Sequence, residues 1–230
     1  MPSAAATASP PRLPILALFT ANAISMTGNQ LAMLAIPWFV LATTGSAVKT
    51  GLTAFFSILP VVLSAFFGGA LVDRIGYKRT SIIADLASGI AVALIPLLYA
   101  AQLLEFWMLL AIVFLGALLD APGTTAREAL VPDLAQAAHM PLERASSLLQ
   151  IVERGSRLLG APLAGILVGT LGAQNVLWLD TATFGVSALL VAVAVPTLRV
   201  APQEQPGSYP AQLREGLLFI RGDRLMLALV

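Results

Sequence analysis

Few side chains in this sequence could do chemistry, and most of those interrupt long apolar runs. The first such set shares one helical face, because its members recur at i, i+3 and i+7 with an amide beside them: Asn22, Ser25, Asn29 and Gln30. A polar face of this kind cannot point into lipid without a free-energy cost. It therefore forms hydrogen bonds between helices, lines a substrate cavity, or does both.

A second polar set lies one hundred residues further along, where Asp120 and Thr124 recur at a spacing of four and Arg127 continues the same face toward the helix end. Pro122 and Gly123 between them are expected to loosen the helix. An ionisable residue inside a membrane segment is a functional candidate by default, so Asp120 could contact substrate or carry protons. It could also simply pair with an arginine at the inner mouth of the protein.

The third set consists of Glu153 and Arg157, whose i, i+4 order favours an ion pair within one helix. We expect this pair to be structural more often than part of a proton path. Small residues follow at a spacing of four, which is typical of helices that pack backbone to backbone. The residues we expect to serve this packing are Gly160, Pro162, Gly165 and Gly169.

Three other ionisable residues receive less specific interpretations. Asp85 lies near the start of an apolar segment, where the helix dipole favours an acid, so we interpret it as structural. Asp180 shares a face with Thr183 and Ser187 and is expected near the outer end of its helix, in an outer-leaflet hydrogen bond. His139, the single histidine, is expected in a solvated loop.

The composition predicts an integral membrane protein. Of the 230 residues, 58% are hydrophobic and 11% are charged, whereas soluble domains carry about 25% charged residues. The net charge of +1 argues against nucleic acid as a partner. The sequence has no cysteine and no metal-ligand cluster, phosphate-binding loop or nucleophile elbow, so we expect neither an enzyme nor a bound cofactor or metal.

The fold class expected is an all-α integral membrane bundle, because a membrane helix needs about 20 apolar residues and this sequence holds six such segments. They are Ile15–Leu41, Gly51–Val72, Thr80–Tyr99, Phe106–Thr125, Ala145–Leu171 and Val176–Val195. The expected organisation is a disordered cytoplasmic tail (1–13), the six-span bundle (14–197), a cytoplasmic linker with an amphipathic helix (198–224) and the start of an incomplete seventh span (225–230).

Orientation follows from the arginines and lysines, which accumulate in cytoplasmic loops. All but Lys49 fall at or near one side of the six segments, Arg127 among them. Both ends of the six-span unit are therefore expected to be cytoplasmic in a multi-pass protein of the cell membrane.

Within the stretch from Gly68 to Arg79 an apolar run gives way to charged residues, and a second apolar run follows this stretch. Asp73 is expected at the C-terminal end of a helix, where it needs a cation as partner. Gly76 would supply the left-handed backbone of a tight helix-to-helix turn. We therefore interpret the stretch as a short cytoplasmic hairpin between two spans, closed by an ion pair.

This hairpin resembles the signature loop of the major facilitator superfamily. The resemblance rests on matching positions within a loop between the expected second and third spans, with Tyr77 as a departure: Gly69, Leu71, Asp73, Arg74, Gly76, Lys78 and Arg79. It implies the N-terminal half of that fold, built of 3+3 inverted repeats, with the loop acting as a conformational switch and not as a substrate ligand.

Two further stretches carry resemblances within the same superfamily. The exit of the expected fourth span, Asp120 to Leu134, is similar to the drug-efflux branch that includes macrolide exporters. Gly160 to Gly165 is similar to an exporter antiporter motif, although Ala161 separates the usual Gly-Pro pair. The resemblances imply a proton-coupled secondary transporter that exports amphipathic small molecules by alternating access. Such a transporter would need the lipid bilayer and either a second six-span half or a second copy of this chain. The alternative function is that of a truncated or accessory membrane module that does not transport alone.

Overall fold

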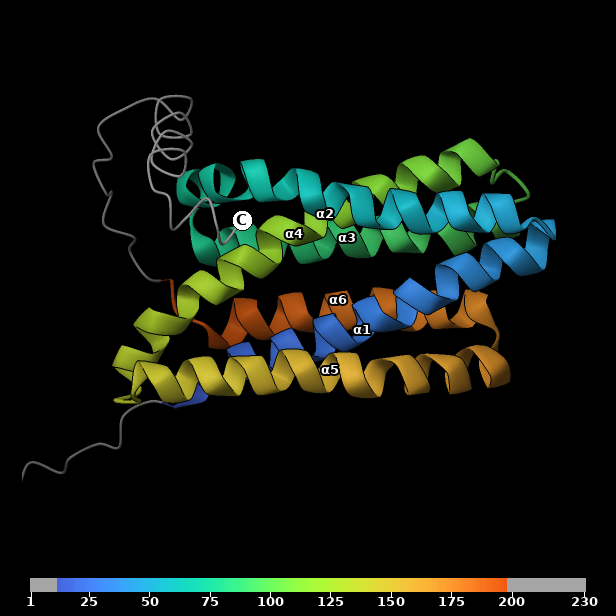
Figure 1. Cartoon of the computed structure of the whole chain (residues 1–230). Coiled ribbons are helices and arrows are strands. Elements are labelled where there is room, and N and C mark those ends of the chain that lie inside the picture. The colour runs from blue at the N-terminus through green and yellow to red at the C-terminus, as the bar shows by residue number, and fades with distance from the viewer. Residues whose placement is uncertain (1–11, 198–230) are drawn as a thin grey trace, which may run out of the picture. The chain divides into compact units, whose positions relative to one another are not determined.

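The computed structural model describes residues 12–197, apart from the side chains of residues 65–71, 73 and 74. The described residues form six helices and no strand (Figure 1): α1 (Leu13–Thr44), α2 (Ala47–Ile75), α3 (Tyr77–Ala100), α4 (Phe106–Ala137), α5 (Leu142–Leu171) and α6 (Ala173–Ala194). The expected all-α bundle is confirmed. The expected tail, linker helix and incomplete seventh span fall almost entirely outside the described residues.

Five of the six described helices are long and apolar enough to cross a membrane, judged by length and composition. The remaining helix, α5, has 30 residues but carries more charge than the others. The fourth helix is longer than expected, because it continues through Pro122, Gly123 and Pro132 and ends at Ala137. The expected loosening at Pro122 and Gly123 does not interrupt it.

Two of the short connections turn at a single glycine. Gly76, between α2 and α3, has φ 90° and ψ 141°, and Gly172, between α5 and α6, has φ 83°. Residues with a Cβ rarely adopt such positive φ values, so glycine is required at both turns. The prediction for Gly76 is right about the sign of φ, but its ψ is extended and not left-handed helical.

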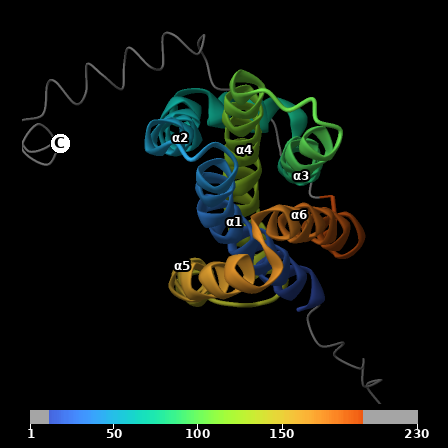
Figure 2. The ribbon, with the colours of Figure 1, turned by 90° about the vertical axis from the view of Figure 1, so that its right-hand side faces the viewer.

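The helices surround a central pair, α1 and α4, in the view along the bundle (Figure 2). Helix α1 packs against α5 and α6, α3 packs against α4 and α6, and α2 packs against α4. Two apolar clusters hold this arrangement together. One gathers around the first part of α1, from Ile15 to Ala21, and the other around its later part, from Leu31 to Val40. Five of the nine α1 residues between these two clusters are polar: Asn22, Ser25, Thr27, Asn29 and Gln30.

Candidate functional site

A layer of buried polar side chains lies between the two apolar clusters. Helices α1, α3, α4 and α6 all contribute to it, and the buried members on these helices include Asn22, Ser25, Asp85, Ser88, Arg127, Asp180 and Ser187. Buried polar groups are costly unless they are paired or serve a ligand. Each polar group of this layer must therefore either be paired within the described chain or be available to a ligand.

Arg127 of α4 is the centre of a hydrogen-bond network within this layer. Its Nη1 donates to Asp85 Oδ1 of α3 at 2.7 Å, and both side chains are buried. Its Nε donates to Asn22 Oδ1 of α1 at 3.1 Å. Ser187 of α6 donates to the other oxygen of Asp85 at 2.7 Å. One ion pair thus connects four helices. Its additional hydrogen bonds compensate the two charges for the hydration that they lose on burial.

This network corrects two interpretations made from the sequence. Asp85 lies beyond the first turn of α3, where the helix dipole has little effect, and it is an ion-pair partner instead. Arg127 points into the bundle with 1% of its surface exposed, and is not a cytoplasmic loop residue. Asp120 forms no salt bridge with Arg127, although the two lie close enough to interact electrostatically.

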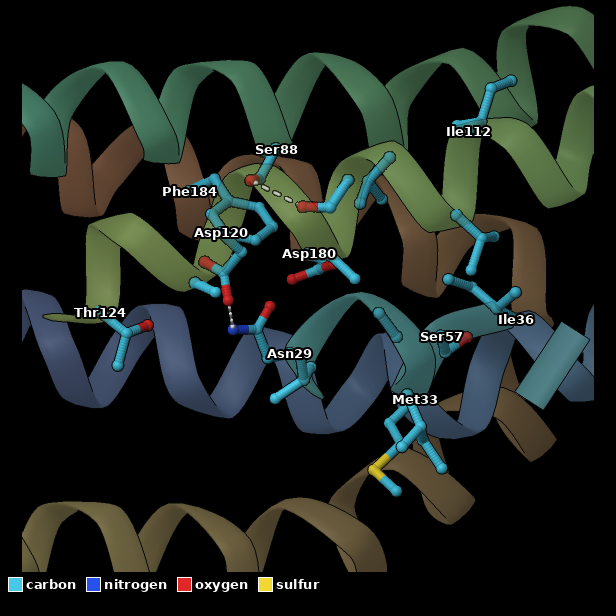
Figure 3. Close-up of a pocket in the computed structure, with 18 of the residues that line it drawn as sticks. Asn29, Met33, Ile36, Ser57, Ser88, Ile112, Asp120, Thr124, Asp180 and Phe184 are labelled. Carbon is cyan, nitrogen blue, oxygen red and sulfur yellow. Dashed lines mark hydrogen bonds between the residues drawn. The ribbon is translucent and has the colours of Figure 1, made fainter. Parts of the chain in front are cut away.

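Asp120 of α4 instead accepts a hydrogen bond from Asn29 Nδ2 of α1 at 2.9 Å (Figure 3). Its second oxygen, Oδ1, is buried and has no hydrogen-bond partner among the described residues. Thr124, one turn along the same helix, accepts a long hydrogen bond of 3.4 Å from Arg127 Nη2. Asp120 and Thr124 therefore lie between the Arg127 network and the space described next.

That space is a cavity of about 630 Å³ between α1, α2, α3, α4 and α6. Most of its wall is apolar, and Met33, Ile36, Ile58 and Ile112 are representative. Its polar groups are few: Asn29, Gln30, Ser57, Ser64, Ser88, Asp120, Thr124, Thr125 and Asp180. A mostly apolar cavity with a small number of placed polar groups is the usual form of a small-molecule site.

Asp180 of α6, for which the sequence predicted only an outer-leaflet hydrogen bond, lines this cavity. Its surface is fully buried, and it lies beside Gly28, near the middle of α1. Thr183 Oγ1 lies 3.3 Å from Asp180 Oδ1, whereas Oδ2 has no partner among the described residues. The sequence did not show that α6 packs this face against α1.

Five residues of the expected polar sets do not line the cavity: Asn22, Ser25, Arg127, Glu153 and Arg157. Ser25 is buried, but its hydroxyl has no hydrogen-bond partner among the described residues. The expected ion pair between Glu153 and Arg157 does not form, since the described side chains show the Asp85–Arg127 pair and no other salt bridge. Arg157 is instead exposed on α5.

The small residues of α5 pack in a different register from the one expected. Gly160 is buried against Gln30 of α1, so close that a Cβ would lie 2.5 Å from Gln30 Cβ. A Cβ added at Gly165 or Gly169 would meet no other part of the described protein within 4 Å, and Pro162 is exposed. The buried face therefore passes through Gly160, as predicted, and continues to Ala164 and Val168, while Pro162, Gly165 and Gly169 are exposed.

The signature loop is described in part. Asp73 and Arg74 lie in the last turn of α2, but their side chains, like that of Leu71 and the environment of Gly69, are outside the description. Lys78 donates from Nζ to the Ala192 carbonyl oxygen at 2.8 Å, which ties the turn at Gly76 to the end of α6. Arg79 is exposed.

The roles of Asp85 and Asp180 were not predicted from the sequence. The signal was present, because each is the only ionisable residue deep within its apolar segment. Neither has the spacing of a metal site, and the described residues contain no group of three His, Asp or Glu side chains that could hold a metal ion.

Long apolar helices around a mostly apolar cavity that contains buried acids are the architecture of a membrane transport protein. The chain matches the Major Facilitator Superfamily over residues 18–230. It therefore belongs to this superfamily.

Several relatives are efflux pumps. The chain is 32% identical to the multidrug efflux pump Tap of Mycolicibacterium fortuitum over 79% of its own length and 45% of that protein. It is 29% identical to Tap of Mycobacterium tuberculosis (94% and 52%) and 22% identical to macrolide efflux protein A of Streptococcus pyogenes (95% and 54%). The chain thus spans about half the length of these relatives. No solved structure matches it significantly.

Proposed function

We propose that this chain forms one six-helix bundle of a secondary transporter that exports amphipathic small molecules. The observation that carries the proposal is the cavity between α1, α2, α3, α4 and α6, which is apolar over most of its wall and acidic at Asp120 and Asp180. The efflux relatives support the direction of transport. The absence of a catalytic constellation in the sequence favours transport over an intramembrane enzyme.

The proposed mechanism is alternating access with proton entry as the driving force. A second six-helix unit, either a separate half or a second copy of this chain, would complete the cavity from the opposite side. Asp73, Arg74 and the basic residues after Gly76 would hold one access state by docking against that unit. Support for this loop comes from its sequence and from the tight turn that the backbone makes at Gly76.

We further propose that the protein lies in the cell membrane with both ends of the six-helix unit in the cytoplasm. The hydrogen bond from Lys78 to Ala192 supports this orientation, because it places the basic turn between α2 and α3 beside the end of α6. Arg12, which precedes α1, and Arg144, in the first turn of α5, belong to the same predicted side.

Reconstitution tests the proposed function. The full chain is inserted into proteoliposomes, a proton gradient is imposed, and entry of a fluorescent amphipathic drug is followed. Gradient-dependent accumulation that disappears with a protonophore is the expected result. A well-folded preparation that shows no uptake, alone or with a second six-helix unit, would favour a membrane module that does not transport.

A further inference from the structure

Helices α3 and α6 lie side by side (Figure 2) and are joined by two contacts deep within the bundle. Gly89 of α3 lies against α6, since a Cβ added at Gly89 would be 3.1 Å from Phe184 Cβ. One turn before Gly89, Asp85 accepts a hydrogen bond from Ser187 at 2.7 Å. Phe184 and Ser88 both line the cavity (Figure 3), so the two joined helices form part of its wall.

A third contact joins the same helices at the end that carries the signature loop. Lys78, the second residue of α3, donates from Nζ to the Ala192 carbonyl oxygen at 2.8 Å. Ala192 is among the last four residues of α6, whose carbonyl groups have no partner within the helix. The last turn of α6 contains no basic residue of its own. Lys78 therefore supplies, from α3, the cation that the negative end of α6 favours.

The residue before Lys78 also ties the turn to the end of α6. Tyr77 is partly buried and packs against the apolar cluster that includes Val191 and Val195. It is the residue at which this loop departs from the superfamily signature. The turn at Gly76 is thus fixed to its own bundle through two consecutive residues, one by charge and one by apolar contact.

We propose that α3 and α6 move as one lever between the signature loop and the cavity, with Lys78 as the positioning residue that attaches α6 to the loop. Only Gly76 separates α2 from α3, so a displacement of the loop is passed directly to Lys78. The contacts along the two helices then carry it to the cavity wall at Ser88 and Phe184. Packed helices of this kind shift between discrete arrangements and do not deform continuously.

The inference deepens the proposed function, on which it rests for the idea that the loop changes between access states. It adds the path by which the loop acts on the cavity. It also assigns Lys78 to its own bundle, so that docking against the second unit is left to Asp73, Arg74 and Arg79.

The reactivity of a cysteine in the cavity wall tests the lever. Ser88→Cys introduces the single cysteine of the chain at a buried position that lines the cavity, so it reacts when the wall opens. The full chain in detergent is treated with a small hydrophilic maleimide, with and without Lys78→Met. We expect Lys78→Met to raise the labelling rate at least about twofold, because losing a cation at a helix C-terminus shifts an equilibrium by that order. A lysine that only stabilised the last turn of α6 would leave this rate unchanged.

Further variants separate the charge of Lys78 from its hydrogen bond. Lys78→Arg keeps both and should restore the natural labelling rate. Lys78→Gln keeps N–H donors without the charge and should raise the rate, so it also decides the question if Lys78→Met does not fold. Arg144→Met is the matched control, because Arg144 is an exposed basic residue of α5, and it should leave the rate unchanged.

Unchanged labelling in both uncharged Lys78 variants would overturn the lever. So would a raised rate that Lys78→Arg fails to restore, or an equal rise in Arg144→Met, which would show a general effect of basic charge. A rise confined to the uncharged Lys78 variants, in a chain that shows no proteoliposome uptake, supports the lever and counts against transport. The failure of the lever and the failure of the proposed function are therefore distinguishable.

Discussion

Arg127 of α4 and Asp85 of α3 form a buried ion pair with an N–O distance of 2.7 Å, although 42 positions separate them in the sequence. Neither side chain exposes more than 1% of its surface. Asn22 and Ser187 add hydrogen bonds to the pair from two other helices. The pair therefore fixes the relative positions of α1, α3, α4 and α6 on one side of the cavity.

Breaking this pair from one side should strongly destabilise the bundle. Asp85→Asn leaves Arg127 charged and buried without its counter-ion, and such changes cost about 3–5 kcal/mol. Thermal unfolding in detergent is the measurement. Asp133→Asn, an exposed acid on α4, is the control and should change the free energy of unfolding by no more than about 0.5 kcal/mol. Equal unfolding temperatures of the two variants would show that the pair contributes little.

A methyl group at Gly28 should separate α1 from α6. Its Cβ would overlap Thr183 and the carboxyl group of Asp180, so Gly28→Ala should cost about 1–3 kcal/mol through overpacking. Gly185→Ala on α6 is the matched control, because no atom lies within 4 Å of the added group. It should stabilise the helix by about 0.5–1 kcal/mol. Two variants with the same sign of effect would contradict the close approach at Gly28.

The sequence is sufficient to predict the six helices but not which helices pack against one another. Apolar runs of span length predict all six helices of the described region, because helix formation in lipid depends on local composition. The polar face of α1 is equally visible in the sequence, since it follows from a spacing of three and four residues. That Asn22 meets Arg127 while Asn29 meets Asp120 depends on which helices are neighbours, and no local pattern encodes this.

Asp180 is a second residue whose surroundings could not be predicted from the sequence. Its place along α6 can be counted from the sequence, but the direction in which its side chain points depends on the packing of α6. Gly28 allows that packing, because the absence of a Cβ lets α6 approach α1 closely. The close approach depends on Gly28 and Asp180 together, and neither residue alone predicts it.

The register of α5 gives a third prediction. Gly160→Ala should destabilise the bundle, because the added Cβ would lie 2.5 Å from Gln30 Cβ, a backbone-proximal atom that cannot move aside. Gly165→Ala meets no atom within 4 Å and should be neutral or stabilising. Unfolding of the two variants in the same detergent separates them. A larger loss of stability for Gly165→Ala than for Gly160→Ala would instead support helix packing through Gly165, as expected from the sequence.

The acid of the signature loop should act on conformation and not on folding. Asp73→Asn should change the balance of inward-open and outward-open states in the assembled transporter while membrane insertion stays the same. The chain has no cysteine, so a single Ser57→Cys reporter in the cavity can be labelled without background. The labelling rate is compared with and without Asp73→Asn. Identical rates would remove Asp73 from the proposed switch.

Asp120 should contribute to the pH dependence of transport if protons drive the exchange. Protonation removes the negative charge of its carboxylate, so a step of transport that depends on this charge should change as pH passes through its titration. Asp120→Asn cannot titrate and should flatten the pH profile of initial uptake rates in proteoliposomes. The remaining ionisable groups nearby are Asp180 on α6 and the Asp85–Arg127 pair, so a residual dependence is expected. Asp133→Asn should keep the natural profile, and an unchanged profile in Asp120→Asn would exclude Asp120 from the coupling.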